Sequence, residues 1–476
     1  MSVPTTGTVD LADGASATEH LHRALVEAQR RFDELDAVDL GTLDRFRSSY
    51  PDVVPAFEAA RLGSARRTEI AAALREGASA AMAWTWDGGE RPLADHLAGG
   101  AEPLDVTVVD LPGDGLLHPA VPFGGELLSG TALTDAVGAL VERGSATRPV
   151  GDAIVQLVRR AGEDGIDLGG ERIAILGAGA ELAPTRLWLA GGADVLWLDV
   201  VDPPAELLRD ESLSGRLSWV PGGVDLLTAP ERALATIERF ADGADVDLGL
   251  YAYAGGRARE WRLTGTMNAI VEALPLELVR SASMLVSPTT CGTLSPTELA
   301  GEERRRRDRP RWQAVLERLR LLGRGPGHAV SGSARSNRAV VSIQGTSYQA
   351  AQYLGKIIAA EAWATGPDAL TVSANTAGIS RTESLQHPVF DLAFSGASAF
   401  GVETFEPSTT AQLNGLLVLH DRLDPPASLD VDTLFTTRVH GGISEVPYPI
   451  EPALRIAAAI GLARNPGRLP TLLRRR

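Results

Sequence analysis

The segment from residue 169 to 200, GGERIAILGAGAELAPTRLWLAGGADVLWLDV, most constrains the fold of this chain. An apolar strand leads into a glycine-containing turn, a helix with Pro184 in its first turn follows, and ADVLWLD is typical of a second strand. Strand, helix and strand within about thirty residues form a βαβ unit, whose parallel strands need helices on both faces of the sheet. We therefore predict an α/β fold with a Rossmann-like, doubly wound parallel sheet.

The same alternation continues beyond this unit. GVDLLT, at 223–228, is predicted as the next strand, and later strands are predicted in VDLGLYAYAGG, SMLVSPTTCG and ALTVSANTAGISRT, with helices between them. These segments define a Rossmann-like domain at 169–450. A charged, partly helical insertion is expected at about 295–337, and a polar, helix-poor lid at about 383–430.

The two ends of the chain differ from this domain. Residues 1–168 are predicted as a mainly helical extension with a small β element, in which LDVTVVDLP is the clearest strand and a single helix covers about 132–164. TTRVHGG, at 436–442, is predicted as the last strand and turn, and 451–476 as a C-terminal helix with a basic tail.

Composition excludes some classes of partner. The net charge is -16, whereas binding to nucleic acid or an anionic membrane requires a cationic face, so a small-molecule substrate is favoured. The sequence has neither a signal peptide nor an apolar run long enough to span a membrane, so we expect a cytoplasmic protein. The single cysteine, Cys291, is predicted to be a buried inert thiol, and the scattered histidines predict no metal site. The run Arg304 to Arg307 is predicted to be a solvated helix face.

The turn after the first strand of the βαβ unit is a candidate phosphate site. Gly177-Ala178-Gly179-Ala180 leads the chain toward a helix N-terminus, where free N–H groups favour an anion. Asp199 ends the second strand, where a carboxylate can accept hydrogen bonds from an adenosine ribose and repel a 2′-phosphate. The turn and this acid together predict NAD, with NADP disfavoured. Alternatively, Asp199 is a solvent-facing acid at a strand end.

The order of motifs resembles the short-chain dehydrogenase/reductase (SDR) superfamily over about 170–445. VSANTAGISRT is similar to the family segment V-N-A-V-x-P-G-x-x-x-T, with Gly378 and Thr382 in register, and Tyr348 then occupies the position of the catalytic tyrosine. YAYAGG corresponds to the family's N-N-A-G strand end, and Asn268 lies in the helix that carries the family's structural asparagine. VSPTTCG is similar to the strand that ends in the catalytic serine. RVHGG is similar to the V-D-G-G motif near the last strand.

The resemblance implies roles for several side chains. Tyr348 is the general acid or base, and Thr289 supplies the hydroxyl that polarises a carbonyl, with Ser287 or Thr290 as alternatives. The family pattern Tyr-x-x-x-Lys is broken, because Gln352 takes the lysine position and the only lysine in the chain, Lys356, follows one turn later. On a regular helix Lys356 lies about 80° round from the tyrosine and about 12 Å along the axis. It can be a displaced catalytic lysine or a chance helix residue.

The resemblance also implies a nucleotide site, and the chain departs from the family there. Glu181 and Ala183 align with the second and third glycines of T-G-x-x-x-G-x-G, and the carboxylate of Glu181 repels a pyrophosphate unless it pairs, for example with Arg186. The implied cofactor contacts come from Gly177, Gly179, Ala180, Leu182, Asp199, Asp225, Ala254, Gly255, Gly378 and Thr382.

Two functions follow from these motifs. The first is an NAD(P)-dependent oxidoreductase acting on a carbonyl, an alcohol or an activated double bond of a small molecule. The second is an SDR-fold protein without cofactor or redox activity, either a dehydratase or isomerase or a binding subunit, which the departures at Gln352 and Glu181 favour. The resemblance further implies a homo-oligomer formed through the helices that include Tyr348.

Overall fold

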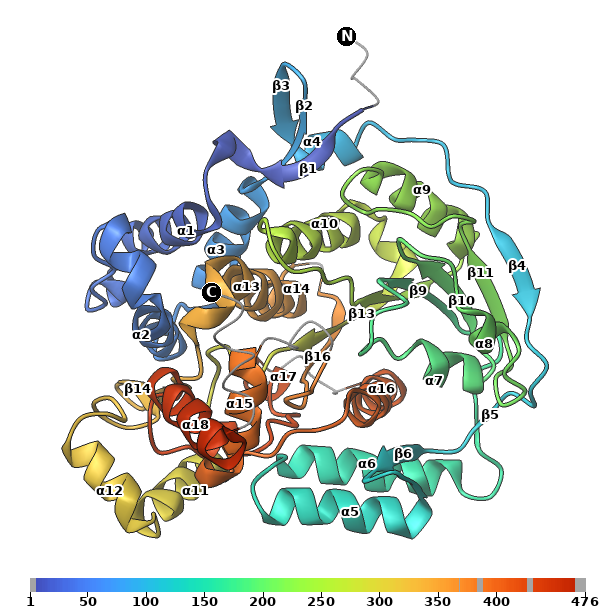
Figure 1. The fold of residues 1–476 in the computed structure, drawn as a ribbon. Helices are drawn as coiled ribbons and strands as arrows, with labels where there is room; N and C mark the ends of the chain where they lie inside the picture. The colour runs from blue at the N-terminus through green and yellow to red at the C-terminus, as the bar shows by residue number, and fades with distance from the viewer. Residues whose placement is uncertain (1–5, 368, 383–387, 426–430, 467–476) are drawn as a thin grey trace.

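The computed structural model describes residues 6–367, 369–382, 388–425 and 431–466, and its centre is a seven-stranded, mostly parallel sheet (Figure 1). The strand order is β16-β13-β12-β9-β10-β11-β4. The first six are parallel, and β4 is antiparallel to β11 at the edge. In chain order the parallel strands run 3-2-1-4-5-6, which is compatible with a Rossmann-like fold. The strands are β4 (Thr107–Asp110), β9 (Arg172–Leu176), β10 (Asp194–Leu198), β11 (Arg216–Trp219), β12 (Val246–Leu250), β13 (Val279–Val286) and β16 (Thr371–Thr376).

Helices cover both faces of this sheet because successive strand residues point to opposite sides. On one face, Ala174 and Leu176 of β9 pack in a core with α9 (Pro230–Ala241) and α10 (Arg259–Ala273). On the other face, Ile173 and Ile175 pack in a second core with α6 (Arg148–Ala161), α7 (Thr185–Ala190) and α16 (Pro407–Leu423). The near-continuous apolar strands of the sequence are explained by this two-sided burial.

One long helix carries Tyr348 and crosses the first face beside α10. It consists of α13 (Gly345–Gln352), a π-helical turn η5 (Tyr353–Ile358) and α14 (Ala359–Thr365). Its outer side is covered by three helices of the N-terminal region, α1 (Ala17–Arg31), α2 (Leu43–Leu62) and α3 (Arg67–Ala80), shown in blue in Figure 1.

A buried ionic network joins this helix to the N-terminal region. Arg61 of α2 donates to both carboxylate oxygens of Glu58 and of Glu361, at 2.7 to 3.0 Å, and Tyr353 donates to Glu58 at 2.8 Å. All four side chains are buried. This side of the Tyr348 helix is therefore occupied by α1–α3 of the same chain.

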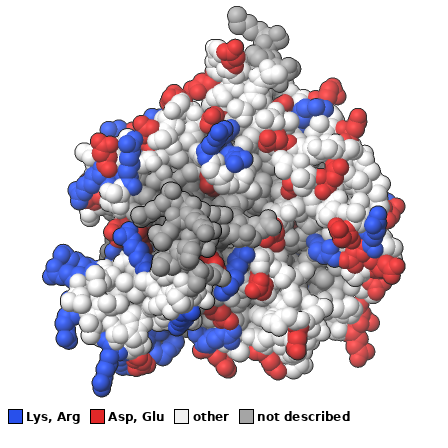
Figure 2. Space-filling view, in the orientation of Figure 1, with Lys and Arg blue, Asp and Glu red and all other residues white. Residues whose placement is uncertain are grey.

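The C-terminal helices form a third core beside the sheet, at the lower left of Figure 1. There α15 (Pro388–Ala397) packs closely on α18 (Ile450–Arg464), next to α11 (Pro296–Arg307) and α12 (Arg311–Arg318). On the face drawn in Figure 2, basic side chains gather at the lower left, over these last two helices. Arg305 and Arg306 nevertheless turn partly inward to backbone carbonyls, so the predicted solvated face holds for Arg304 and Arg307 only.

The remaining elements are short or lie at the rim of the molecule. They are β1 (Thr8–Leu11), β2 (Met82–Trp86), β3 (Gly89–Pro92), α4 (Leu93–Leu97), β5 (Leu116–Leu117), β6 (Ala120–Phe123), β7 (Glu126–Ser129), α5 (Gly130–Glu142), β8 (Ile166–Asp167), α8 (Ala205–Leu208), β14 (His328–Ser331), β15 (Ala334–Asn337) and α17 (Val431–Leu434). Among the described segments, none of the helices combines the length and apolarity that a bilayer crossing needs.

Four predictions of elements are corrected by the structure. GVDLLT forms turns, and the third strand is β11 just before it. The predicted helix at 132–164 is two helices, α5 and α6, because Gly144 adopts a positive φ of 69° between them. The helix-poor lid contains α15 and α16, each with proline as its first residue and an apolar face. TTRVHGG makes one isolated bridge, Arg438 to Thr376, and no strand.

The strand predicted in LDVTVVDLP is present as β4, but it does not belong to a separate N-terminal β element. It pairs with β11 and so forms the antiparallel edge of the central sheet. The boundary expected near residue 168 is therefore crossed by the sheet itself, as well as by the ionic network around Arg61.

Candidate active site at the carboxyl ends of the strands

A cavity of about 450 Å³ lies over the carboxyl ends of β9, β12, β13 and β16. Ligands of open α/β sheets bind at this edge, where strand order reverses. The cavity brings together ten of the predicted site residues: Gly179, Ala180, Leu182, Ser287, Thr289, Tyr348, Gln352, Lys356, Gly378 and Thr382. The polar side chains among them come from the loops after β13 and β16 and from the α13–α14 helix.

The hydroxyls after β13 form a connected chain. Thr289 donates its hydroxyl proton to Gln344 Oε1 at 2.8 Å, and the oxygens of Ser287 and Thr289 are 2.8 Å apart. Because the proton of Thr289 is already used, Ser287 is the donor in that pair. Both hydroxyls line the cavity, so the structure leaves both predicted positions open to a substrate carbonyl.

Tyr348 projects into the same cavity beside these hydroxyls. Burial raises the pKa of its phenol, while the side chains of Ser287, Thr289 and Gln344 oppose that rise by favouring the phenolate. The ring of Tyr253, from the loop after β12, meets it edge to face with centroids 6.2 Å apart. At neutral pH Tyr348 therefore holds its proton, which is the form needed by a general acid.

Lys356 lines this cavity because the helix changes its pitch just before it. The π-helical turn Tyr353–Ile358 contains more residues per turn than an α-helix, so each residue advances less than 100° round the axis. The 80° offset of a regular helix is thereby reduced, and Tyr348, Gln352 and Lys356 all reach one wall. The ammonium donates to the carbonyl of Leu285 at 2.6 Å, and burial lowers the pKa of Lys356 to about 8.

Asn268 and Gln352 hold the elements around the lysine. Asn268 of α10 donates to the carbonyl of Gly355, inside the π-helical turn, at 2.7 Å, and it lies behind the cavity wall. Gln352 accepts from the backbone N–H of Ser287 at 2.9 Å, which fixes the end of β13 against the helix. The geometry therefore gives Asn268 the part of a positioning residue.

The glycine turn is close to its predicted geometry. Gly177 has a φ of 87°, and a Cβ there would lie 2.2 Å from the backbone nitrogen of Ala252, so only glycine fits. The N–H of Gly179 donates to Asp199 at 2.9 Å, and those of Ala180 and Ala183 donate to backbone carbonyls of the turn. The side chain of Glu181 is exposed, and Arg186 pairs with Asp210.

Several predicted site residues lie outside the cavity wall. Asp225 is exposed and accepts from the N–H of Leu227, and Ala254 and Gly255 lie in the loop that leads to α10. Tyr353 is fully buried and donates to Glu58, and Cys291 is buried as predicted. Gly177, Asp199 and Asn268 stand behind the wall as supports.

Sequence reasoning missed two members of the site. Gln344 precedes the helix and receives the proton of Thr289, and Tyr253 covers Tyr348. Tyr253 could have been predicted, because it belongs to the strand-end segment YAYAGG. Gln344 carried no signal, because nothing in its local sequence indicates contact with a strand end 55 residues earlier.

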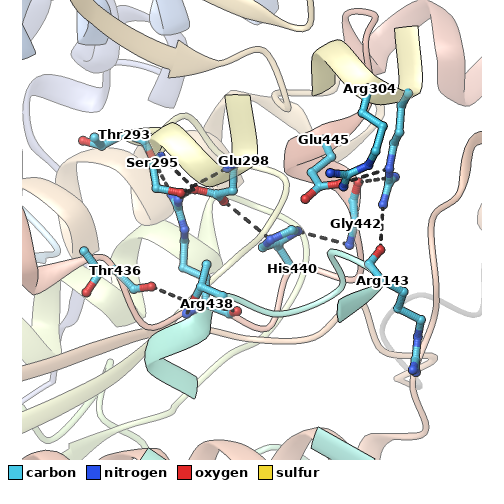
Figure 3. Close-up of polar contacts among 12 residues, drawn as sticks. Arg143, Thr293, Ser295, Glu298, Arg304, Thr436, Arg438, His440, Gly442 and Glu445 are labelled. Carbon is cyan, nitrogen blue, oxygen red and sulfur yellow. Dashed lines mark hydrogen bonds and ion pairs between the residues drawn. The ribbon is translucent and has the colours of Figure 1, made fainter. Parts of the chain in front are cut away.

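Glu298, Arg438 and His440 form a second buried cluster (Figure 3). Arg438 pairs with Glu298 and holds the pKa of that carboxyl below its usual range. Burial lowers the pKa of His440 to about 4, and its Nδ1 accepts from the N–H of Gly442. These contacts fix the turn whose Ile443 forms part of the cavity wall, so the cluster acts as a structural clamp.

Comparison with known proteins adds nothing to this geometry. No protein-family model matches the chain, and no curated protein matches it significantly in sequence. The candidate function therefore depends on the site itself.

Proposed function

We propose that this chain is an NAD-dependent oxidoreductase that acts on the carbonyl or alcohol of a small molecule, with Tyr348 as the general acid or base. One observation carries the proposal: Tyr348, two hydroxyls and the single lysine line one cavity at the carboxyl ends of a Rossmann-like sheet. These groups come from distant parts of the sequence, and the lysine lies within a π-helical turn of the helix that carries Tyr348.

The roles of the side chains follow from their protonation. Tyr348 donates its proton to the carbonyl oxygen in the direction of reduction, since burial keeps the phenol protonated at neutral pH. Ser287 can turn its hydroxyl proton from Thr289 to the developing oxyanion or to the resulting phenolate, while Thr289, whose own proton is donated to Gln344, holds Ser287 in place. Lys356, with a pKa of about 8, is cationic at neutral pH and stabilises negative charge in this apolar site.

The residues present fit the adenosine end of NAD. The carboxylate of Asp199 is held by the N–H of Gly179 beside the glycine turn, where ribose hydroxyls could bind it. Gly179, Ala180 and Leu182 connect that turn to the cavity that holds Tyr348. When bound, NADH would supply the hydride to the carbonyl carbon.

The glycine turn also favours a second candidate, an acid–base enzyme without redox activity. Three of its N–H groups already donate to acceptors within the protein, Glu181 brings a carboxylate, and α7 is only six residues long. A pyrophosphate is therefore offered few free donors. The same tyrosine and hydroxyls could then catalyse a dehydration or an isomerisation next to a carbonyl.

Nucleotide binding separates the two candidates. We expect calorimetric titration to give a micromolar Kd for NADH, weaker binding of NADPH, and loss of that preference in Asp199→Ser. Glu181→Gly should tighten both nucleotides, because it removes a negative charge and restores the family glycine. If wild type and Glu181→Gly both fail to bind any nucleotide, the non-redox candidate replaces the first.

A further inference from the structure

The cavity has two chemically different halves. The polar half contains Tyr348, Lys356 and the hydroxyls after β13. The other half lies along α15 and α18 and is lined mainly by hydrocarbon, although the described wall of the cavity also includes Ser380, Thr382 and Thr404. The members of this apolar chamber are Val341, Ile379, Phe390, Ala393, Phe394, Ala397, Phe400, Val402, Ile443, Val446, Ile450, Ala453, Leu454 and Ala457. The two charged residues that line the cavity, Glu181 and Lys356, both lie in the polar half.

Glycines bring α15 and α18 into direct backbone contact. A Cβ on Gly396 would lie 1.9 Å from the carbonyl oxygen of Ala457, and one on Gly461 would lie 1.9 Å from that of Leu392, so the backbones meet at these glycines. Beside this contact the chamber is walled by the methyl groups of Ala393 and Ala453, which leave room that larger side chains would fill.

We propose that the substrate is a carbonyl compound with a long, uncharged hydrocarbon chain, the carbonyl lying at Tyr348 and the chain lying in the apolar chamber. This substrate class rests on the proposed function for its carbonyl end. A charged tail is disfavoured because it would lose its hydration in the chamber, where the described wall offers no charged side chain. The volume of about 450 Å³ lies within the range of drug-sized ligand sites, roughly 300–1,000 Å³.

Chain length is the variable to measure. We would titrate the whole protein with straight-chain 2-ketones from six to fourteen carbons by calorimetry, without nucleotide. Each buried methylene should tighten binding by about fourfold, until the chamber is full and the gain stops. An affinity that does not depend on chain length would overturn the proposal.

Two variants should change, in opposite directions, the chain length beyond which affinity no longer increases. Ala453→Leu fills the chamber and should stop the gain at shorter chains, whereas Phe394→Ala enlarges it and should extend the gain to longer chains. Ala459→Leu makes the same change on the exposed side of α18 and should leave the series unchanged. Thermal unfolding checks that each variant is folded. If the dependence of affinity on chain length is the same in Ala453→Leu and Phe394→Ala as in the wild type, the proposal is wrong.

Failure of this proposal differs from failure of the proposed function. Chain-length-dependent binding in a protein that binds no nucleotide would retain the substrate class and remove the oxidoreductase. Turnover of short, polar carbonyls with NADH, without tighter binding of longer chains, would retain the oxidoreductase and remove the substrate class. Comparing a 2-ketone with an acyl thioester of equal chain length shows which carbonyl head group the polar half accepts.

Discussion

Replacing Lys356, the only lysine in the chain, by methionine should change the way stability depends on pH. Burial lowers the folded-state pKa of this ammonium to about 8, against the ordinary lysine value of 10.5. The folded state therefore loses its proton at lower pH than the unfolded state does. Between pH 8 and 10.5 the unfolded state binds more protons, so wild-type stability rises with pH in that window.

The magnitude follows from the same two values. With folded and unfolded pKa values of about 8 and 10.5, the gain between pH 7 and pH 10 is about 2.5 kcal/mol. Lys356→Met has no ammonium and lacks this gain. Tyrosines and Cys291 also titrate in alkali, but they are present in both proteins and cancel in the difference.

The assay is urea unfolding of both proteins at pH 7, 8, 9 and 10. We expect the free energy of unfolding of wild type, relative to Lys356→Met, to increase by about 2.5 kcal/mol across the series. A second reading comes from NMR, since ¹³C-labelled lysine gives the resonances of one side chain, whose titration reports the pKa directly. A constant difference in unfolding free energy, or a lysine that titrates near 10.5, would refute the burial of this ammonium.

Four further variants test other parts of the structure. Tyr348→Phe should abolish turnover with little loss of nucleotide affinity, measured by kinetics and calorimetry, and wild-type rates would show that another group is the acid. Asn268→Leu removes the hydrogen bond to the π-helical turn and should cost about 1–3 kcal/mol in urea unfolding while shifting the NMR titration of Lys356. Arg61→Leu leaves the buried carboxylate of Glu58 without its cation and leaves Glu361 with Arg67 alone, so it should cost about 3–5 kcal/mol, whereas the exposed Arg30→Leu should cost less than about 1 kcal/mol. The folded-state pKa of His440 is about 4, below its unfolded value of 6.5, so the stability of the wild type falls by about 2 kcal/mol between neutral pH and pH 5 through this group. His440→Gln should remove that part of the acid sensitivity. Equal slopes of unfolding free energy against pH in the two proteins would contradict it.

The sequence predicted the central sheet because burial on both faces leaves a strong pattern. The strands β9, β10, β12 and β13 are mostly apolar, and all four are present, as is the more polar predicted strand β16. β11 was missed because RLSW is short and half polar, while the more apolar GVDLLT beside it forms turns. Local pattern could not separate these two segments, since pairing with β10 and β4 decides between them.

Residues of the site whose positions follow from sequence spacing could be predicted, whereas residues whose positions depend on helix geometry could not. The spacing to Gly378 pointed to Tyr348, and both line the cavity. The position of Lys356 depends on a π-helical turn that Asn268 supports from another helix, and no local propensity indicates such a turn. The apolar chamber was also invisible, because it is formed by two helices about 60 residues apart that meet through glycines.

Calorimetric titration of the purified chain with NADH tests the central claim most directly. We expect a micromolar Kd for NADH, lower than that for NADPH, with the preference depending on Asp199. Absence of binding by all four nicotinamide nucleotides, in wild type and in Glu181→Gly, would contradict it and leave Tyr348 and its hydroxyls as an acid–base site without redox chemistry.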